Sequence, residues 1–285
     1  MSSSHGGWVA YKYYPSMAAA VIFILLFLAA TALHTYHVFR TRTWFFIPFI
    51  IGGIFETIGY VGRAVSSHQS PNWALGPYIL QSTLLLVAPA LFAASIYMEL
   101  GRIIVLVHGE KHSLVRVTWM TKIFVAGDVL SFLMQASGAG LLASKGTATN
   151  NTGNNVIIGG LFVQIIFFGF FLVSAVVFQR RIARRPTPQS QAEYIPWRKH
   201  LLALHGSSVL ILIRSIFRVV EYLQGQDGYL LTTEAFLYVF DALLMFSVMV
   251  VFAAVHPSEI NCLLGRGRVM TTKGGLAVSE FVVPV

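Results

Sequence analysis

Long apolar stretches alternate with short polar segments along this chain. Seven of the stretches are long enough to cross a bilayer, since the hydrocarbon core is about 30 Å thick and a helix rises about 1.5 Å per residue. Turn-forming runs such as Ser70-Pro71-Asn72 separate them. We therefore expect an all-α, polytopic membrane protein with seven transmembrane helices in one bundle. The predicted spans are residues 16–39, 44–65, 78–100, 117–143, 156–178, 201–223 and 233–255.

Composition supports this class. Of the 285 residues, 56% are hydrophobic and 11% are charged, whereas a soluble globular domain carries roughly 25% charged residues. A cytosolic enzyme, a disordered chain and a disulfide scaffold are thereby excluded. We divide the chain into an N-terminal segment over residues 1–14, the seven-helix domain over 15–257 and a tail over 258–285.

Lysine and arginine are distributed unequally between the two predicted sides. One side consists of the loops after spans 1, 3 and 5 and the tail, and the other side holds only Lys12 and Lys145. The first side holds fourteen basic residues: Arg40, Arg42, Arg102, Lys111, Arg116, Arg180, Arg181, Arg184, Arg185, Arg198, Lys199, Arg266, Arg268 and Lys273. By the positive-inside rule, this predicts an outer N-terminus and a cytosolic C-terminus. Asn150, in the sequon Asn150-Asn151-Thr152, then lies on the outer side, where it can be glycosylated.

The net charge of +9 raises the question of a nucleic-acid partner. The basic residues lie in short clusters between apolar runs, which is how a membrane protein retains its cytosolic loops. The charge therefore indicates topology, and we expect no nucleic-acid partner.

Polar residues inside the spans are the candidate functional residues, because charge within a bilayer is costly. In spans 2, 4, 6 and 7 they recur at spacings of three, four or seven, which places them on one face of each helix. The candidate substrate-binding residues are Glu56, Tyr60, Arg63, Gln81, Asp128, Gln135, Gln164, Arg214, Arg218, Glu221, Glu234, Tyr238 and Asp241.

Three of the charged residues, Glu56, Asp128 and Arg214, lie at a similar depth. Each is about ten to thirteen residues from a span end, which is near the bilayer midplane. We expect the polar faces to surround a cavity, although buried ion pairs that only fix the helix arrangement are an open alternative. The candidates include three arginines and five acids, a surplus of −2 when all are ionised, which suits an ammonium head group.

Two local features lead to finer predictions. Arg214 and Arg218 lie four residues apart on span 6, so we expect at least one to pair with Glu56, Asp128 or Asp241 and the other to be free for a lipid phosphate or carboxylate. Pro89 inside span 3 removes a helical hydrogen bond and frees a carbonyl that can face a cavity.

Histidines near one end of the bundle offer an alternative chemistry. His34 and His37 are three residues apart, and His205 is predicted at a similar level in span 6. They are candidate ligands for haem. Apart from this alternative we expect no cofactor and no metal.

Motifs follow one another in order from about Tyr13 to Pro257 and make the chain resemble the fungal RTA-like proteins. This family is also called the lipid-translocating exporter family and is named for resistance to aminocholesterol. The matching pieces are Tyr14-Pro15, Glu56-Thr57-Ile58-Gly59-Tyr60, Arg63, Gln81, Ala88-Pro89, Tyr97, Asp128, Gln135-Ala136-Ser137-Gly138, Gly160-Leu161, Gln164, Arg214, Phe217-Arg218, Glu221, Glu234, Tyr238 and Asp241.

The resemblance implies a function in lipid or amphiphile transport. Its partners would be membrane lipids or amphiphilic small molecules such as sphingoid long-chain bases or sterol amines, and it would confer resistance to toxic amphiphiles. It implies no enzymatic activity and a place in the plasma membrane, with an endomembrane as the alternative. Two other functions stay open: a receptor-like lipid sensor, and a haem- or porphyrin-binding transporter.

Overall fold

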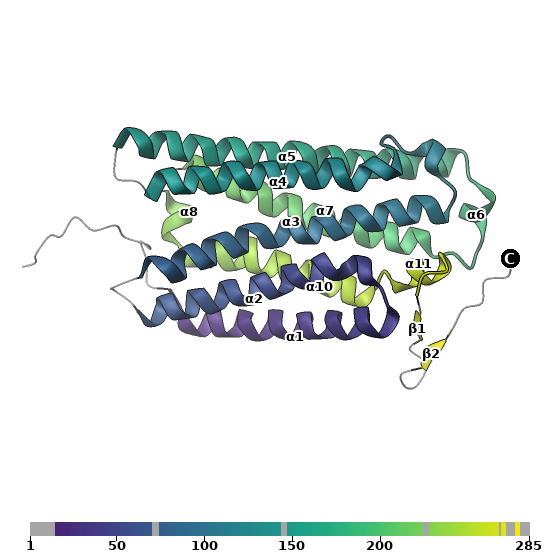
Figure 1. The fold of residues 1–285 in the computed structure, drawn as a ribbon, viewed down its shortest axis with the longest axis horizontal. Coiled ribbons are helices and arrows are strands. Elements are labelled where there is room, and N and C mark those ends of the chain that lie inside the picture. The colour runs from purple at the N-terminus through teal and green to yellow at the C-terminus, as the bar shows by residue number, and fades with distance from the viewer. Residues whose placement is uncertain are drawn as a thin grey trace, which may run out of the picture.

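The computed structural model describes residues 15–69, 74–143, 147–224, 228–267, 269–271 and 277–279. Within them, seven helices are long and apolar enough to cross a membrane, as the sequence predicts. They lie side by side as one elongated bundle (Figure 1). Large apolar side chains such as Leu25, Ile166 and Leu202 remain exposed on its outside, as expected of helices that face lipid.

Six spans are single long helices and the seventh is composite. The six are α1 (Met17–Thr41), α2 (Ile47–His68), α3 (Leu75–Leu106), α4 (Val117–Ala143), α5 (Thr147–Arg184) and α7 (Trp197–Leu223). The seventh consists of α9 (Glu234–Leu237), the π-helical segment η3 (Tyr238–Leu243) and α10 (Leu244–Ala254). Several helices extend beyond the predicted apolar stretches, because polar residues outside a bilayer can continue a helix.

Short elements connect the spans and follow the last one. They are η1 (Trp44–Phe46), η2 (Glu110–His112), α6 (Pro188–Gln191), α8 (Tyr229–Thr232), α11 (Ser258–Leu263), β1 (Val269–Thr271) and β2 (Ala277–Ser279). The two strands pair antiparallel, with Val269 opposite Ser279. They lie outside the bundle, so the spanning part is all-α (Figure 1).

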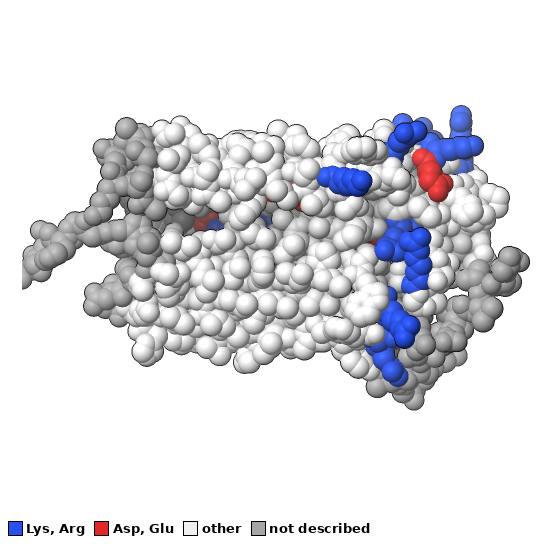
Figure 2. All heavy atoms as spheres, viewed as in Figure 1, with Lys and Arg blue, Asp and Glu red and all other residues white. Residues whose placement is uncertain are grey.

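Lysine and arginine gather at one end of the bundle, the end that carries α11 (Figure 2). We call this the basic end and the end that carries α8 the opposite end. Among the described residues, the predicted charge asymmetry is therefore present along the bundle axis. The predicted N-terminal segment over 1–14 and the residues Lys12, Lys145, Arg268 and Lys273 lie outside them. The cytosolic placement of the basic end stays a prediction.

Close packing joins α4 and α5 along most of their length. A Cβ added at Gly138 would lie 2.7 Å from the carbonyl oxygen of Gly153, and one added at Gly160 would lie 2.9 Å from that of Ser131. Only glycine allows the two backbones to approach so closely. In contrast, α3 and α4 leave space between them toward the opposite end, where the cavity lies.

Candidate functional site: a charged cavity between the helices

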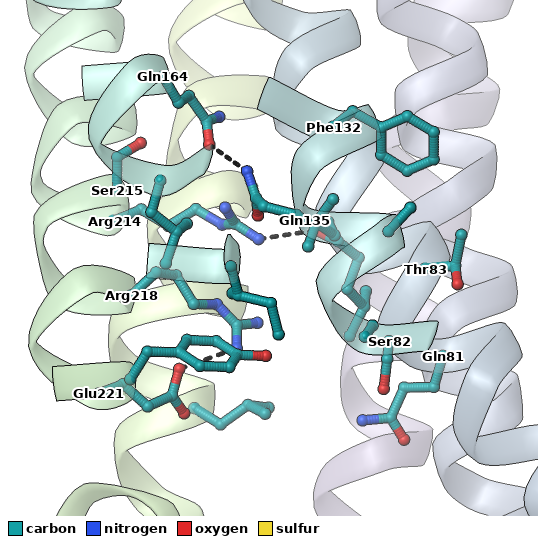
Figure 3. A pocket seen from close by; sticks show the side chains of 18 of the residues that line it. Gln81, Ser82, Thr83, Phe132, Gln135, Gln164, Arg214, Ser215, Arg218 and Glu221 are labelled. Carbon is teal, nitrogen blue, oxygen red and sulfur yellow. Dashed lines mark hydrogen bonds and ion pairs between the residues drawn. The ribbon is translucent and has the colours of Figure 1, made fainter. Parts of the chain in front are cut away.

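A cavity of about 190 Å³ lies inside the opposite half of the bundle. Its walls come mainly from α3, α4, α5, α7 and the segment before the last span, and Arg63 reaches it from α2. The lining is part polar and part apolar. Figure 3 shows its central polar groups, which include Gln81, Gln135, Gln164, Arg214, Ser215, Arg218 and Glu221.

The cavity opens sideways between α3 and α4. Its lining includes Ser82 and Thr83 on α3 and Ala136 and Ala139 on α4, and all four of these side chains are exposed on the outer face of the bundle. In Figure 2 charged atoms are visible in a crevice between these helices, and the described surface around it in the opposite half of the bundle shows no other charge. This mouth faces the side of the bundle, where lipid would be, so a charged interior is reached from an apolar surface.

Two arginines of α7 share one aspartate at the cavity wall. The Nε of Arg214 donates to Oδ1 of Asp241, and Nη2 of Arg218 donates to its Oδ2 at 2.6 Å. Arg218 also donates to Glu221 at 3.0 Å. The prediction of at least one arginine–acid pair is confirmed, but the prediction that the other arginine is free is wrong, because both bind Asp241.

The proline of α3 completes the binding of Arg214. Pro89 has no N–H, so the carbonyl of Leu85, four residues earlier, lacks its helical donor. The Nη2 of Arg214 donates to that carbonyl at 2.6 Å. As the sequence predicts, the proline frees a carbonyl beside the cavity, and the structure adds that an arginine from another helix satisfies it.

The π-helical segment η3 carries Asp241 to the two arginines. Single π turns are rare and occur frequently at functional sites. Here the π-helical segment runs from Tyr238 to Leu243 and includes Asp241. No local sequence signal in an apolar span predicts this feature.

A second ion pair lies beside the cavity and involves the lining residue Arg63. Arg63 donates from Nη2 to Glu234 at 2.8 Å and from Nε to the hydroxyl of Tyr238 at 3.0 Å. Glu234 also accepts the backbone N–H of Ser16 at 2.9 Å. These contacts join α2, the last span and the start of α1 at one point.

Two polar groups behind the cavity wall have no hydrogen-bond partner among the described residues. Both carboxyl oxygens of Glu56 and the hydroxyl of Tyr60, one helical turn later, are buried and unpaired. Glu56 interacts electrostatically with Asp241, Arg214 and Arg218. It therefore belongs to the same charge cluster without being bonded to it.

Amide groups line the other side of the cavity. The Nε2 of Gln135 on α4 donates to Ser131 at 2.6 Å and to Gln164 on α5 at 3.4 Å. Ser131 in turn donates to the carbonyl of Gly160 at 2.8 Å. These bonds fix the two amides opposite the arginines (Figure 3).

Asp128 does not join the cavity. Its Oδ2 accepts from the hydroxyl of Tyr97 at 3.0 Å, and both residues are buried. It lies seven residues before Gln135, about 10 Å along the helix, and is absent from the lining. Similar depth in the membrane therefore did not imply a shared site.

The lining separates the thirteen predicted residues into two groups. Seven line the cavity: Arg63, Gln81, Gln135, Gln164, Arg214, Arg218 and Glu221. Glu56, Tyr60, Glu234, Tyr238 and Asp241 lie behind or beside its wall, and Asp128 is separate. Further polar lining residues are not distinguishable in the sequence, because small hydroxyl residues and tyrosines are common in spans: Tyr78, Ser82, Thr83, Ser215 and Tyr222.

Comparison with known proteins identifies the family of this chain. A family model described as RTA1 like protein matches residues 49–262. This chain belongs to the RTA1-like family. Its relatives in Saccharomyces cerevisiae include Protoporphyrin uptake protein 1, which is 40% identical with 89% of this chain and 93% of the relative covered. Sphingoid long-chain base transporter RSB1 is 28% identical, with 90% and 74% covered.

A third RTA1-like relative is Protein RTA1 of the same yeast, 37% identical with 88% of this chain and 86% of the relative covered. No solved structure matches the chain. The family match begins within α2 and ends in α11, so it includes every span but the first. The predicted resemblance to fungal RTA-like proteins is thus confirmed.

The candidate haem ligands of this RTA1-like chain lie apart from the cavity. The Nε2 of His34 lies 3.0 Å from the carbonyl of Met249, and Nδ1 of His205 lies 2.6 Å from that of Leu201 in its own helix. His37 packs against His256, with ring centroids 5.0 Å apart. Burial holds the pKa of His256 well below its usual range. A haem role for His34, His37 or His205 stays a prediction.

Asn150, the predicted glycosylation site, lies in the first turns of α5. Its side chain is outside the described part of the structure. Glycosylation therefore also stays a prediction.

A second charge cluster, which the sequence analysis missed, lies at the basic end. We define the basic-end cluster as Glu99, Lys199, His200 and Glu259. Nδ1 of His200 lies 3.3 Å from Glu99, and its Nε2 lies 2.9 Å from Glu259, which also accepts from Lys199 at 3.1 Å. Glu259 belongs to α11, so the cluster ties that short helix to α3 and α7.

Proposed function

We propose that this RTA1-like chain moves amphiphilic, lipid-like molecules across or between the leaflets of a membrane. The polar head group would enter the cavity through the mouth between α3 and α4, and the apolar tail would remain in the bilayer. The observation that carries the proposal is the mouth itself: exposed Ser82, Thr83, Ala136 and Ala139 lead from the side of the bundle to buried arginines and amides. No bond-making step is part of this function.

The charges around the cavity support an ammonium head group. Arg63, Arg214 and Arg218 contribute +3, and Glu56, Glu221, Glu234 and Asp241 contribute −4, which leaves −1 when all are ionised. Asp128 no longer counts, because it lies apart with Tyr97. A single positive charge on a sphingoid base or sterol amine would balance the remainder.

The names of the relatives support amphiphiles as a class and differ in detail. One is named for a sphingoid long-chain base and another for protoporphyrin. A long-chain base carries an amine, whereas protoporphyrin carries carboxylates. Both combine a charged group with a large apolar part, which is the combination that a charged cavity with a side opening would accommodate.

Transport by reconstituted protein tests this proposal. We expect proteoliposomes with the wild-type chain to move sphingosine between leaflets faster than empty liposomes. Ala136→Trp places a large ring in the mouth and should reduce the rate at least tenfold. Ala18→Trp, on an exposed residue of α1 away from the cavity, is the matched control and should leave the rate unchanged.

Two results would contradict the proposal. The first is that sphingosine moves no faster in protein-containing liposomes than in empty ones, and that the same holds for protoporphyrin. The second is an equal rate for Ala136→Trp and Ala18→Trp, which would mean that substrate does not pass the mouth. A visible absorption spectrum of the purified protein separates the haem alternative, because bound haem would give a Soret band that His34→Ala or His205→Ala removes.

A further inference from the structure

Glu56 is the one acid of the cavity region whose carboxyl group the structure leaves without a hydrogen bond among the described residues. It is fully buried on α2, and neither Oε1 nor Oε2 has a partner. In contrast, Asp241, Glu221 and Glu234 each accept at least one hydrogen bond from an arginine. An ionised carboxylate without a donor is among the most costly groups to bury.

The charge balance of the cavity cluster also singles out Glu56. Arg214 and Arg218 are balanced by the two acids that bind them, Asp241 and Glu221. The charged groups that act on Glu56 are Asp241 from η3 and the two arginines from α7, and its titratable neighbour on α2 is Tyr60. With Glu56 protonated the cluster is neutral, and with Glu56 ionised it carries −1.

We propose that Glu56 is a proton-exchange site, which carries a proton while the cavity is empty and releases it when a cationic head group enters. The O–H bond of the Glu56 carboxyl breaks, the proton leaves to water, and the ammonium of the ligand takes over as the balancing positive charge. Each transport event would then exchange one proton for one cation. The exchange rests on the proposed function, whereas the protonated state of the empty protein does not.

This exchange would supply an energy source for transport. A buried site in a low dielectric favours overall neutrality, so proton and cation compete for the same negative charge. A proton gradient across the membrane would then drive movement of the amine in the opposite direction. Tyr60, whose hydroxyl is also buried and unpaired among the described residues, lies one turn from Glu56 on the same helix and interacts with it electrostatically, so it is the candidate to relay the proton.

The first test uses the empty protein and needs no substrate. Infrared spectra of the full-length protein in nanodiscs at neutral pH should contain a carboxylic-acid C=O band that Glu56→Gln removes. Asp128→Asn is the matched control, since Asp128 is buried but bound to Tyr97 away from the cavity. It should leave the Glu56 band in place. Glu56→Asp should move the band rather than remove it, which covers the case in which Glu56→Gln fails to fold.

Identical carboxylic-acid regions for the wild type, Glu56→Gln and Glu56→Asp would overturn the proposal, because Glu56 would then be ionised. A band that disappears on addition of sodium ions alone would also overturn it. The unpaired oxygens of Glu56 and Tyr60 would then belong to a metal-cation site.

The second test measures exchange. Sphingosine added to lightly buffered wild-type protein should release about one proton per bound molecule, and a long-chain alcohol of equal length should release none. Glu56→Gln removes the negative charge that the ammonium would balance, so it should bind sphingosine more weakly, and the sphingosine that does bind should release no proton. Equal release from both proteins would overturn the assignment to Glu56. If the infrared band is present and no amphiphile binds, the proposed function fails and the exchange step fails with it, while protonated Glu56 is established.

Discussion

The two charge clusters described above each join helices, and they differ in whether they face an open volume. In the basic-end cluster, His200 binds Glu99 on one side and Glu259 on the other, and Lys199 adds to Glu259. None of these residues lines the cavity. Beside the cavity, Arg214 and Arg218 line an open volume, and Glu56 behind them has no hydrogen bond among the described residues.

From this difference we infer a structural role for the basic-end cluster and propose a ligand-binding role for the cavity cluster. The basic-end cluster connects α3, α7 and α11, so it holds the short helix α11 against the bundle. The cavity cluster also connects helices, but it presents charge to a space that opens toward lipid. Substitutions should therefore affect mainly stability at the basic end, and both stability and ligand handling at the cavity.

The largest expected loss of stability follows Asp241→Asn. Asp241 is 1% exposed and is the shared acceptor of both arginines. Removing its charge leaves the buried Arg214 without an ionised partner and Arg218 with Glu221 alone, which costs about 3–5 kcal/mol. Thermal unfolding in detergent should show a large fall in Tm. A variant as stable as the wild type would mean that the arginines do not depend on this residue.

The two arginines should differ, which sharpens the comparison within the cavity cluster. Arg214 is 4% exposed and also satisfies the carbonyl that Pro89 frees, whereas Arg218 is 20% exposed. We expect Arg214→Gln to cost about 3 kcal/mol and Arg218→Gln about 1.5 kcal/mol. Thermal unfolding of the two variants side by side measures this. Equal losses would show that the residues share one structural role.

Glu259 provides a pH test of the basic-end cluster. Hydrogen bonds from His200 and Lys199 lower the pKa of Glu259 from 4.5 to about 2. Since the folded value is the lower one, its stabilisation is present above about pH 4.5 and is lost as the pH falls through about 2. When the free energy of unfolding is measured as the pH falls through this window, Glu259→Gln should lose less stability than the wild type loses. Parallel curves would contradict the assignment.

Lys199→Gln should have the smallest effect. The lysine is 47% exposed and its partner Glu259 is 33% exposed, and an exposed ion pair of this kind contributes at most about 1 kcal/mol. We expect little change in Tm and less change still at high salt. A loss as large as that of Asp241→Asn would remove the distinction between the two clusters.

Much of the fold follows from the sequence, because hydrophobic length determines where helices cross a membrane. All seven spans are present, and the stripe spacing identifies most of the polar residues around the cavity, including Arg214, Arg218 and Asp241. Pro89 also indicates a freed carbonyl. Features that depend on a single helix, such as its length, its polar face and the effect of a proline, can thus be predicted from the sequence.

Other features could not be predicted from the sequence, because they depend on how each helix is rotated and on which helices it packs against. Asp128 has the depth of Glu56 but is bound to Tyr97 on α3, and no single-helix pattern gives that partner. The π turn at Asp241 arises inside an ordinary apolar run. Lys199 is predicted as a topology signal at a span end, so its link through Glu259 to His200 is not visible from spacing.

The most direct test of a substrate cavity between α3 and α4 is to identify the molecules bound to it. Mass spectrometry would compare amphiphiles that co-purify with the wild type, with Ala136→Trp in the mouth and with Ala18→Trp on the outer face of α1. We predict that the wild type and Ala18→Trp retain the same amphiphile and that Ala136→Trp loses it. An identical set of bound molecules in all three proteins would contradict the cavity as the binding site.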